Sequence, residues 1–82
     1  MMNELLKLLD DTLTLRGRGL QLSVDSPLAG TLPELDSMGV VAIVSAAEDH
    51  WGIVIEDEEI DAEVFATVGS LMYFLRSKMA TH

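Results

Sequence analysis

Apolar residues recur at the spacing of an α-helix in three stretches of the chain. The first stretch carries its stripe at Leu5, Leu8, Leu9 and Leu13. Asn3 stands where a capping side chain is expected, and Gly17 and Gly19 follow where the chain would leave the helix. The pattern therefore predicts a first helix that begins at the Asn3 cap and ends at these glycines.

The second stretch follows Ser37, a good helix-capping residue, and Gly52 would stop the helix. Its apolar positions are Val40, Val41, Ile43, Val44, Ala46, Ala47 and Trp51. The last stretch follows another candidate cap, Thr67, and its stripe is Val68, Leu71, Met72, Leu75 and Met79. Asp61 can also cap one short turn of helix over residues 62–65.

Residues 20–36 show no clear period and contain Pro27, Gly30 and Pro33, so they predict a loop. This loop also contains Leu20, Leu22, Leu28, Leu32 and Leu35. A loop with five leucines is expected to pack against a core rather than extend into water. The 82 residues thus predict one all-α domain over 1–82, a bundle of three main helices plus one short helix, with a long loop between the first two.

The inward stripes predict which side chains form the core. These are Leu5, Leu9, Val41, Val44, Ala47, Trp51, Ile55, Val68, Leu71 and Leu75. Near the start of the second helix, the positions expected to face solvent are Gly39, Val40, Ala42 and Ser45. The single Trp51 and the single Tyr73 are expected in the core or at its edge.

Charge is distributed unevenly along the chain. There are 14 acidic and 5 basic residues, a net charge of −9, and no base lies between Gly19 and Leu75, where 11 acids fall. This field disfavours nucleic acid and anionic lipid and favours basic partner surfaces. The absence of cysteine excludes disulfides and thiolate metal sites. No apolar segment reaches the roughly 18 residues of a membrane span, and the N-terminus lacks a basic targeting region, so a cytoplasmic protein is expected.

Ser37 lies where a loop meets a helix, a place that holds a hydroxyl in position and leaves it open to solvent. Taken alone, it is expected only to cap the helix. A serine-hydrolase site is excluded because His50 would lie about 20 Å further along the same helix. The acidic cluster at 56–61 lacks the glycine and ligand spacing of an EF-hand, so no metal site is predicted. The residues do not assemble the parts of a stand-alone enzyme.

The stretch Asp36-Ser37-Met38 and its surroundings resemble the acyl carrier protein family, in which an Asp-Ser-Leu motif opens the second helix. The similarity extends through Glu48-Asp49-His50-Trp51-Gly52-Ile53, Ile55-Glu56-Asp57-Glu58-Glu59 and Thr67-Val68. The resemblance implies that Ser37 carries a 4′-phosphopantetheine arm through a phosphodiester. It implies that Asp36 lies near the magnesium-bound coenzyme A in the transferase complex, and that Met38 replaces the leucine of the motif. The arm ends in a thiol, which would hold an acyl group as a thioester.

The resemblance implies partners of two kinds: a phosphopantetheinyl transferase, and acyl-loading and acyl-transfer enzymes of lipid or fatty-acid biosynthesis with basic or partly apolar docking surfaces. The candidate contact residues are Val40, Ala42, Glu48, Asp49, Glu56 and Asp57. The second helix of the family usually exposes several acids, whereas here acids return only at Glu48 and Asp49. Recognition is therefore expected to be more apolar and more selective, and the chain is expected to be a monomer.

The stretch over 32–38 looks like stand-alone carriers from exosortase-associated polysaccharide gene clusters. Two alternatives stay open at this point. One is an aminoacyl or peptidyl carrier, although those carriers have a Gly-Gly-His-Ser type of motif in place of Asp-Ser-Met. The other is a helical protein-interaction module in which Ser37 is only a cap.

Overall fold

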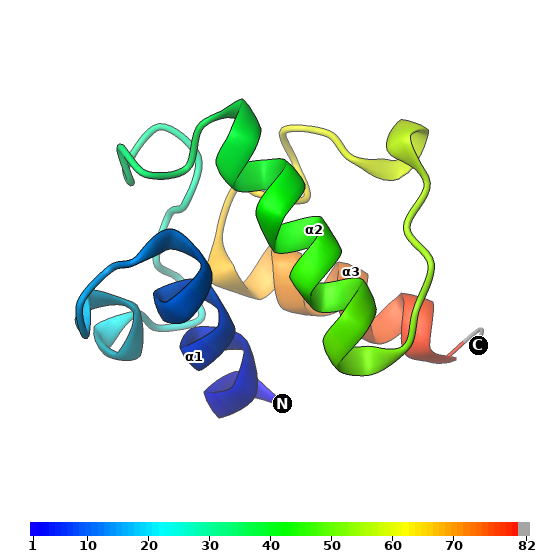
Figure 1. Cartoon of the computed structure of the whole chain (residues 1–82), viewed down its shortest axis with the longest axis horizontal. Coiled ribbons are helices and arrows are strands. Elements are labelled where there is room, and N and C mark those ends of the chain that lie inside the picture. The colour runs from blue at the N-terminus through cyan, green and yellow to red at the C-terminus, as the bar shows by residue number, and fades with distance from the viewer. Residues whose placement is uncertain (81–82) are drawn as a thin grey trace.

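The computed structural model describes residues 1–80, which form three α-helices: α1 (Met2–Leu13), α2 (Ser37–Trp51) and α3 (Val68–Ala80). Two short 3₁₀ helices, η1 (Arg18–Gln21) and η2 (Asp57–Glu59), lie in the connections. In Figure 1, α2 crosses in front of α3, and α1 lies beside α2. The predicted all-α bundle with a long loop between its first two helices is confirmed. None of the helices in residues 1–80 is long and apolar enough to cross a bilayer.

The core lies between the three helices. The predicted core residues that are buried are Leu5, Leu9, Ala47, Ile55, Val68, Leu71 and Leu75. Most of them come from α1 and α3, where they recur every three or four residues. In α1 the charged residues lie mostly off this stripe, so the sequence specifies which face turns inward. In α3 the predicted stripe is buried, although Met72, Tyr73 and Phe74 lie between Leu71 and Leu75.

The rotation of α2 about its own axis differs from the prediction. Val41 was expected in the core but is 65 % exposed, whereas Ile43 and Ala47 are each only 1 % exposed. Val44 and Trp51, also expected in the core, are half-buried. The first ten residues of α2 contain no charge, so apolar side chains occur on every side of the helix and its period does not specify which side is buried.

The same error in rotation affects the positions expected to face solvent near the start of α2. Gly39 is buried, four residues before Ile43 on the same stripe, and Val40 is half-buried against the core. Ala42 and Ser45 are exposed, as predicted. The solvent face of α2 is therefore centred between these two residues and not on Val40.

The ends of α1 also differ from the prediction. The helix begins at Met2, so Asn3 lies inside its first turn and does not cap it. It ends at Leu13, where Thr14 takes a left-handed conformation with φ of 55°. Gly17 and Gly19 lie beyond this point, in the turn that leads into η1. The left-handed backbone of Thr14 ends the helix, and the next amide, that of Leu15, also bonds back to the Asp10 carbonyl, at 3.0 Å.

The predicted end of α2 at Gly52 and the predicted start of α3 at Thr67 are confirmed, whereas residues 62–65, predicted as a short turn of helix, form a hydrogen-bonded turn and not a helix. Gly52 ends α2 with φ of 64° in the left-handed region that glycine adopts without strain. At the start of α3, the Thr67 hydroxyl accepts a hydrogen bond from the Ser70 amide, and the Ser70 hydroxyl accepts one from the Thr67 amide, both at 3.0 Å. Residues 62–65 form a single turn in which the Asp61 carboxylate accepts a backbone hydrogen bond at 3.0 Å.

The long loop packs against the core through most of its leucines. Leu28 is completely buried, and Leu22, Leu32 and Leu35 are half-buried, while Leu20 is 58 % exposed. The backbone attaches the loop to the start of α3: the Leu28 amide donates to the Ala66 carbonyl, and the Gly69 amide donates to the Val24 carbonyl. These contacts give the segment before α2 a defined course.

Tyr73 is 77 % exposed and does not lie in the core or at its edge, where it was expected. The core stripe of α3 runs through Val68, Leu71 and Leu75, and position 73 falls on the other side of that helix.

Candidate functional site

Ser37 is the first residue of α2 and is exposed, as is Met38 after it, with 81 % of its surface open. Figure 1 shows this end of α2 at the top of the molecule, away from the N-terminus and the C-terminal helix end. A hydroxyl here is fixed by the helix that follows and is accessible to a large partner.

The residue that caps α2 is Asp36 and not Ser37. Asp36 has an extended backbone, and its Oδ1 accepts a hydrogen bond from the Gly39 amide at 2.8 Å. Both residue types cap helices well, so the sequence did not distinguish them. The consequence is that the Ser37 side chain is not used in capping.

The backbone around Ser37 is suited to a negatively charged group. The first hydrogen bond of the helix joins the Val40 amide to the Asp36 carbonyl at 2.9 Å. The amides of Ser37 and Met38 lie ahead of it, at the end of α2 where the helix dipole is positive. Such a helix end favours an anion such as a phosphate ester.

The Ser37 hydroxyl has no hydrogen bond to another side chain within residues 1–80, and hence no general base to activate it. His50 lies at the far end of α2, where its Nε2 is 3.0 Å from Oε2 of Glu4. Among the same residues, no three His, Asp or Glu side chains are placed to hold a metal ion together. The site offers an exposed hydroxyl that another enzyme can modify.

Comparison with known proteins supports this interpretation. A scan of protein-family models found no match, and a search of curated proteins found no relative. Among solved structures, the chain is similar to the holo acyl carrier protein from Nitrosomonas europaea, whose structure was solved by solution NMR. The two are 38 % identical, the match covers 96 % of this chain and 95 % of the other, and the TM-score is 0.88.

This chain belongs to the acyl carrier protein family. Identity at this level over nearly the whole length goes beyond a shared fold. As an acyl carrier protein, it holds acyl groups and presents them to other enzymes. The alternative of a helical interaction module that carries nothing is thereby set aside.

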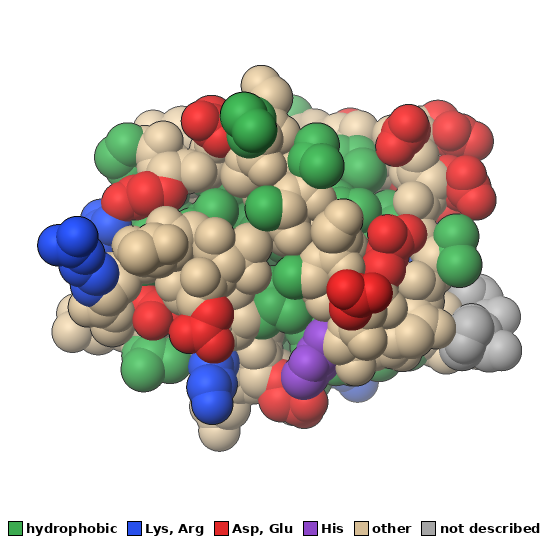
Figure 2. Space-filling model, viewed as in Figure 1, with side chains coloured by type: hydrophobic (Ala, Val, Ile, Leu, Met, Phe, Trp, Pro, Cys, Tyr) green, Lys and Arg blue, Asp and Glu red, His purple; other side chains and the backbone are tan. Residues whose placement is uncertain are grey.

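The predicted partner-contact residues of this acyl carrier protein do not all lie on one exposed surface. Ala42, Asp49, Glu56 and Asp57 are exposed, whereas Val40 is half-buried and packs against the core. Figure 2 shows apolar side chains beside acidic ones on the face that carries α2, with acids gathered near η2 at its upper right. Val41, one residue after Val40, is 65 % exposed.

Glu48 has an internal structural contact. It is half-buried, and its Oε2 accepts a hydrogen bond from the Ile55 amide at 2.8 Å. This contact fastens the segment after Gly52 to the last turns of α2. The sequence contained no signal for it, because a carboxylate seven residues before its backbone partner matches no local capping pattern.

Replacing Asp36 by alanine is expected to lower the free energy of unfolding by about 0.5–2 kcal/mol, because the α2 cap is lost. Asp36→Asn should stay close to the wild type, since its side-chain oxygen can accept the same hydrogen bond from Gly39. Urea unfolding followed by circular dichroism measures both. Equal stability of the alanine variant and the wild type would contradict the capping role.

Proposed function

We propose that this acyl carrier protein carries its acyl group on a 4′-phosphopantetheine arm attached covalently to Ser37. The observation that supports this most directly is the exposed Ser37 hydroxyl at the first position of α2, directly after the Asp36 cap. The arm would supply a terminal thiol that holds an acyl group as a thioester. The chain itself contains no cysteine that could do so.

The residues around Ser37 fit such an attachment. Ser37 would supply the ester oxygen, and the amides of Ser37 and Met38 would favour the phosphate charge at the positive end of α2. Met38 and Val41 leave apolar surface open near the attachment point. Asp36 is fixed by its hydrogen bond to Gly39 and keeps its second carboxylate oxygen for the transferase complex.

The attachment reaction belongs to a phosphopantetheinyl transferase. The Ser37 oxygen forms a bond to the phosphorus that bears the pantetheine, and the phosphoanhydride bond of coenzyme A breaks. Adenosine 3′,5′-bisphosphate leaves with the bonding electrons, and the serine proton passes to a base of the transferase or to solvent. No side chain of residues 1–80 is placed to act as a base for Ser37, so a base supplied by the transferase or by solvent agrees with the surroundings of this serine.

Intact-mass spectrometry tests the proposal. The chain is incubated with coenzyme A and a phosphopantetheinyl transferase of broad specificity, and the product should gain the mass of one phosphopantetheinyl group. Peptide mapping should place that group on Ser37. A chain that stays unmodified, or that is modified at another residue, would refute the assignment.

We propose that partner enzymes dock on the exposed face of α2 and on the acids that follow it. Ala42 and Val41 offer apolar contact within about one turn of Ser37, and Asp49, Glu56 and Asp57 offer charge. Basic groups at the rim of a partner would be attracted by the field of the acids.

We also propose that the carrier is cytoplasmic and acts in lipid or fatty-acid biosynthesis. We propose that it is a monomer, since a net charge of −9 opposes self-association.

Ala42→Glu is expected to weaken the native acyl-loading enzyme while sparing a broad-specificity transferase, because specificity is a difference between affinities. The position is exposed, so the free energy of unfolding should change by no more than about 0.5 kcal/mol. Steady-state kinetics of both enzymes measure the effect. Ala62→Glu, which adds the same charge at an exposed turn far along the chain, is the control. If both variants load like the wild type, this face is not the recognition surface.

A further inference from the structure

We propose that Arg18 and Glu34 are positioning residues for Ser37: their ion pair fixes the segment that leads into α2 and so places the Ser37 hydroxyl for attack in the transferase complex. This inference rests on the proposed attachment of phosphopantetheine to Ser37. It concerns two residues that neither touch the hydroxyl nor belong to the docking face of α2.

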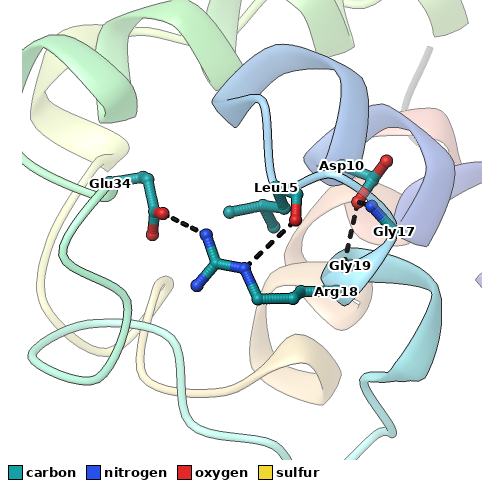
Figure 3. Close-up of polar contacts among 6 residues, drawn as sticks. All are labelled: Asp10, Leu15, Gly17, Arg18, Gly19 and Glu34. Carbon is teal, nitrogen blue, oxygen red and sulfur yellow. Dashed lines mark hydrogen bonds and ion pairs between the residues drawn. The ribbon is translucent and has the colours of Figure 1, made fainter.

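The ion pair joins two parts of the chain that are 16 residues apart. A terminal nitrogen of Arg18 donates to Oε2 of Glu34, and Nε of the same guanidinium donates to the Leu15 carbonyl at 3.1 Å. Figure 3 shows the guanidinium lying between these two acceptors. Because the guanidinium group is planar and makes both contacts, its orientation toward the Glu34 carboxylate is fixed.

The Arg18 end of the pair is anchored on α1. Oδ1 of Asp10 accepts hydrogen bonds from the amides of Gly17 and Gly19, at 2.8 and 3.0 Å, on either side of Arg18 (Figure 3). Gly19 lies so close to α1 that a Cβ added there would be 2.7 Å from the Asp10 Cβ. The backbone that carries Arg18 is thus held against α1.

The Glu34 end of the pair contacts the first turn of α2. A Cβ added at Gly39 would lie 2.6 Å from the Glu34 carbonyl oxygen, so the Glu34 backbone packs directly on that glycine. Gly39 is also the residue whose amide bonds to the Asp36 cap. Glu34 therefore lies between the anchored Arg18 and the turn of helix that begins with Ser37.

The Glu34 carboxylate is turned toward the protein. Its Oε1 is shielded from solvent and has no hydrogen-bond partner within residues 1–80, and the hydrogen bond from Arg18 holds the pKa of Glu34 below its usual value. A shielded carboxylate that loses its cation is expected to turn out to water. Loss of Arg18 should therefore release the segment before Ser37.

The pair is largely at the surface, with 54 % of the Arg18 side chain and 30 % of the Glu34 side chain exposed. Surface ion pairs of this kind contribute little to global stability, so single substitutions should leave the domain folded. What should change is the placement of the hydroxyl. Misplacing a nucleophile by a fraction of a bond length lowers the rate of transfer without weakening docking.

The experiment compares Glu34→Gln and Arg18→Gln with the wild type, using coenzyme A and a broad-specificity phosphopantetheinyl transferase. Each variant should lower kcat about tenfold at saturating carrier, with KM changed less than about twofold. Glu63→Gln and Lys7→Gln are the matched controls, because each removes one exposed charge of the same sign away from this pair. The double exchange Arg18→Glu with Glu34→Arg should recover most of the lost kcat.

Each outcome decides between the alternatives. A fall in kcat that the double exchange rescues supports the proposal. An unchanged kcat overturns the proposal. A change in KM alone, or a loss of kcat that the double exchange does not rescue, also overturns it and indicates instead that these residues contact the transferase directly. If a single variant failed to fold by circular dichroism, Arg18→Lys, which keeps the charge and loses the planar fork, would provide the comparison. Failure of the wild type to be modified on Ser37 would refute the proposed function itself.

Discussion

Ser37→Ala is expected to abolish modification by a phosphopantetheinyl transferase completely, while the domain stays folded. The hydroxyl oxygen is the atom that would form the phosphodiester, and alanine has no substitute for it. Because Asp36 and not Ser37 caps α2, the free energy of unfolding should change by no more than about 0.5 kcal/mol. Intact mass after incubation with coenzyme A and the transferase measures the first effect, and urea unfolding measures the second.

Ser45→Ala is the matched control for this prediction, since Ser45 is exposed on the same helix about two turns further on. It should be modified at the wild-type rate. Modification of the Ser37→Ala protein at Ser45 or at any other hydroxyl would show that the attachment site has been misassigned. A large loss of stability in Ser37→Ala would instead show that the serine has a structural role that the Asp36 cap does not account for.

Ile43→Ala is expected to lower the free energy of unfolding by about 2–5 kcal/mol, because it deletes buried methyl groups and leaves a cavity. Ile43 is 1 % exposed and belongs to the core that α2 shares with α1 and α3. In a domain of only 82 residues, such a loss is a large part of the total stability. Chemical unfolding monitored by circular dichroism gives the value directly.

Val41→Ala provides the contrast, because Val41 lies two residues away on the same helix and is 65 % exposed. Its effect on the free energy of unfolding should be within about 0.5 kcal/mol. Comparable losses in the two variants would mean that α2 is rotated about its axis relative to the structure. The expected difference between them tests the rotation that sequence reasoning predicted incorrectly.

The sequence alone was sufficient for the fold class, for the end of α2 and for the start of α3. In α1, Leu5 and Leu9 recur at helical spacing with the charged residues mostly off their stripe, so the pattern defines a buried face. In α3, the predicted Leu71 and Leu75 are also buried, although the residues between them are Met72, Tyr73 and Phe74. Gly52 ends α2 by local backbone chemistry that depends on no distant residue. The motif at Asp36 and Ser37, and its resemblance to acyl carrier proteins, could also be recognised from the sequence alone.

The rotation of α2 was decided only by tertiary packing. Val40, Val41, Ile43 and Val44 are all apolar, and each of several rotations would bury a similar area. The close packing of Gly39 against the Glu34 carbonyl and Leu13 selects one of them, because no larger residue would fit at that position. Packing of this kind depends on where α1 lies, which the sequence of α2 does not contain.

Some features around Ser37 follow from the local sequence, and others depend on the tertiary structure. Local sequence determined that a helix begins near this serine, that the chain carries a net charge of −9, and that no histidine lies close enough along the helix to activate the hydroxyl. Only the tertiary structure decided that the Glu48 carboxylate accepts a hydrogen bond from the Ile55 amide and that Arg18 reaches Glu34. Those contacts join residues that are 7 and 16 positions apart. The physical reason is that helix starts and charge follow from neighbouring residues, whereas a long-range contact forms only where the folded backbone brings its two partners together.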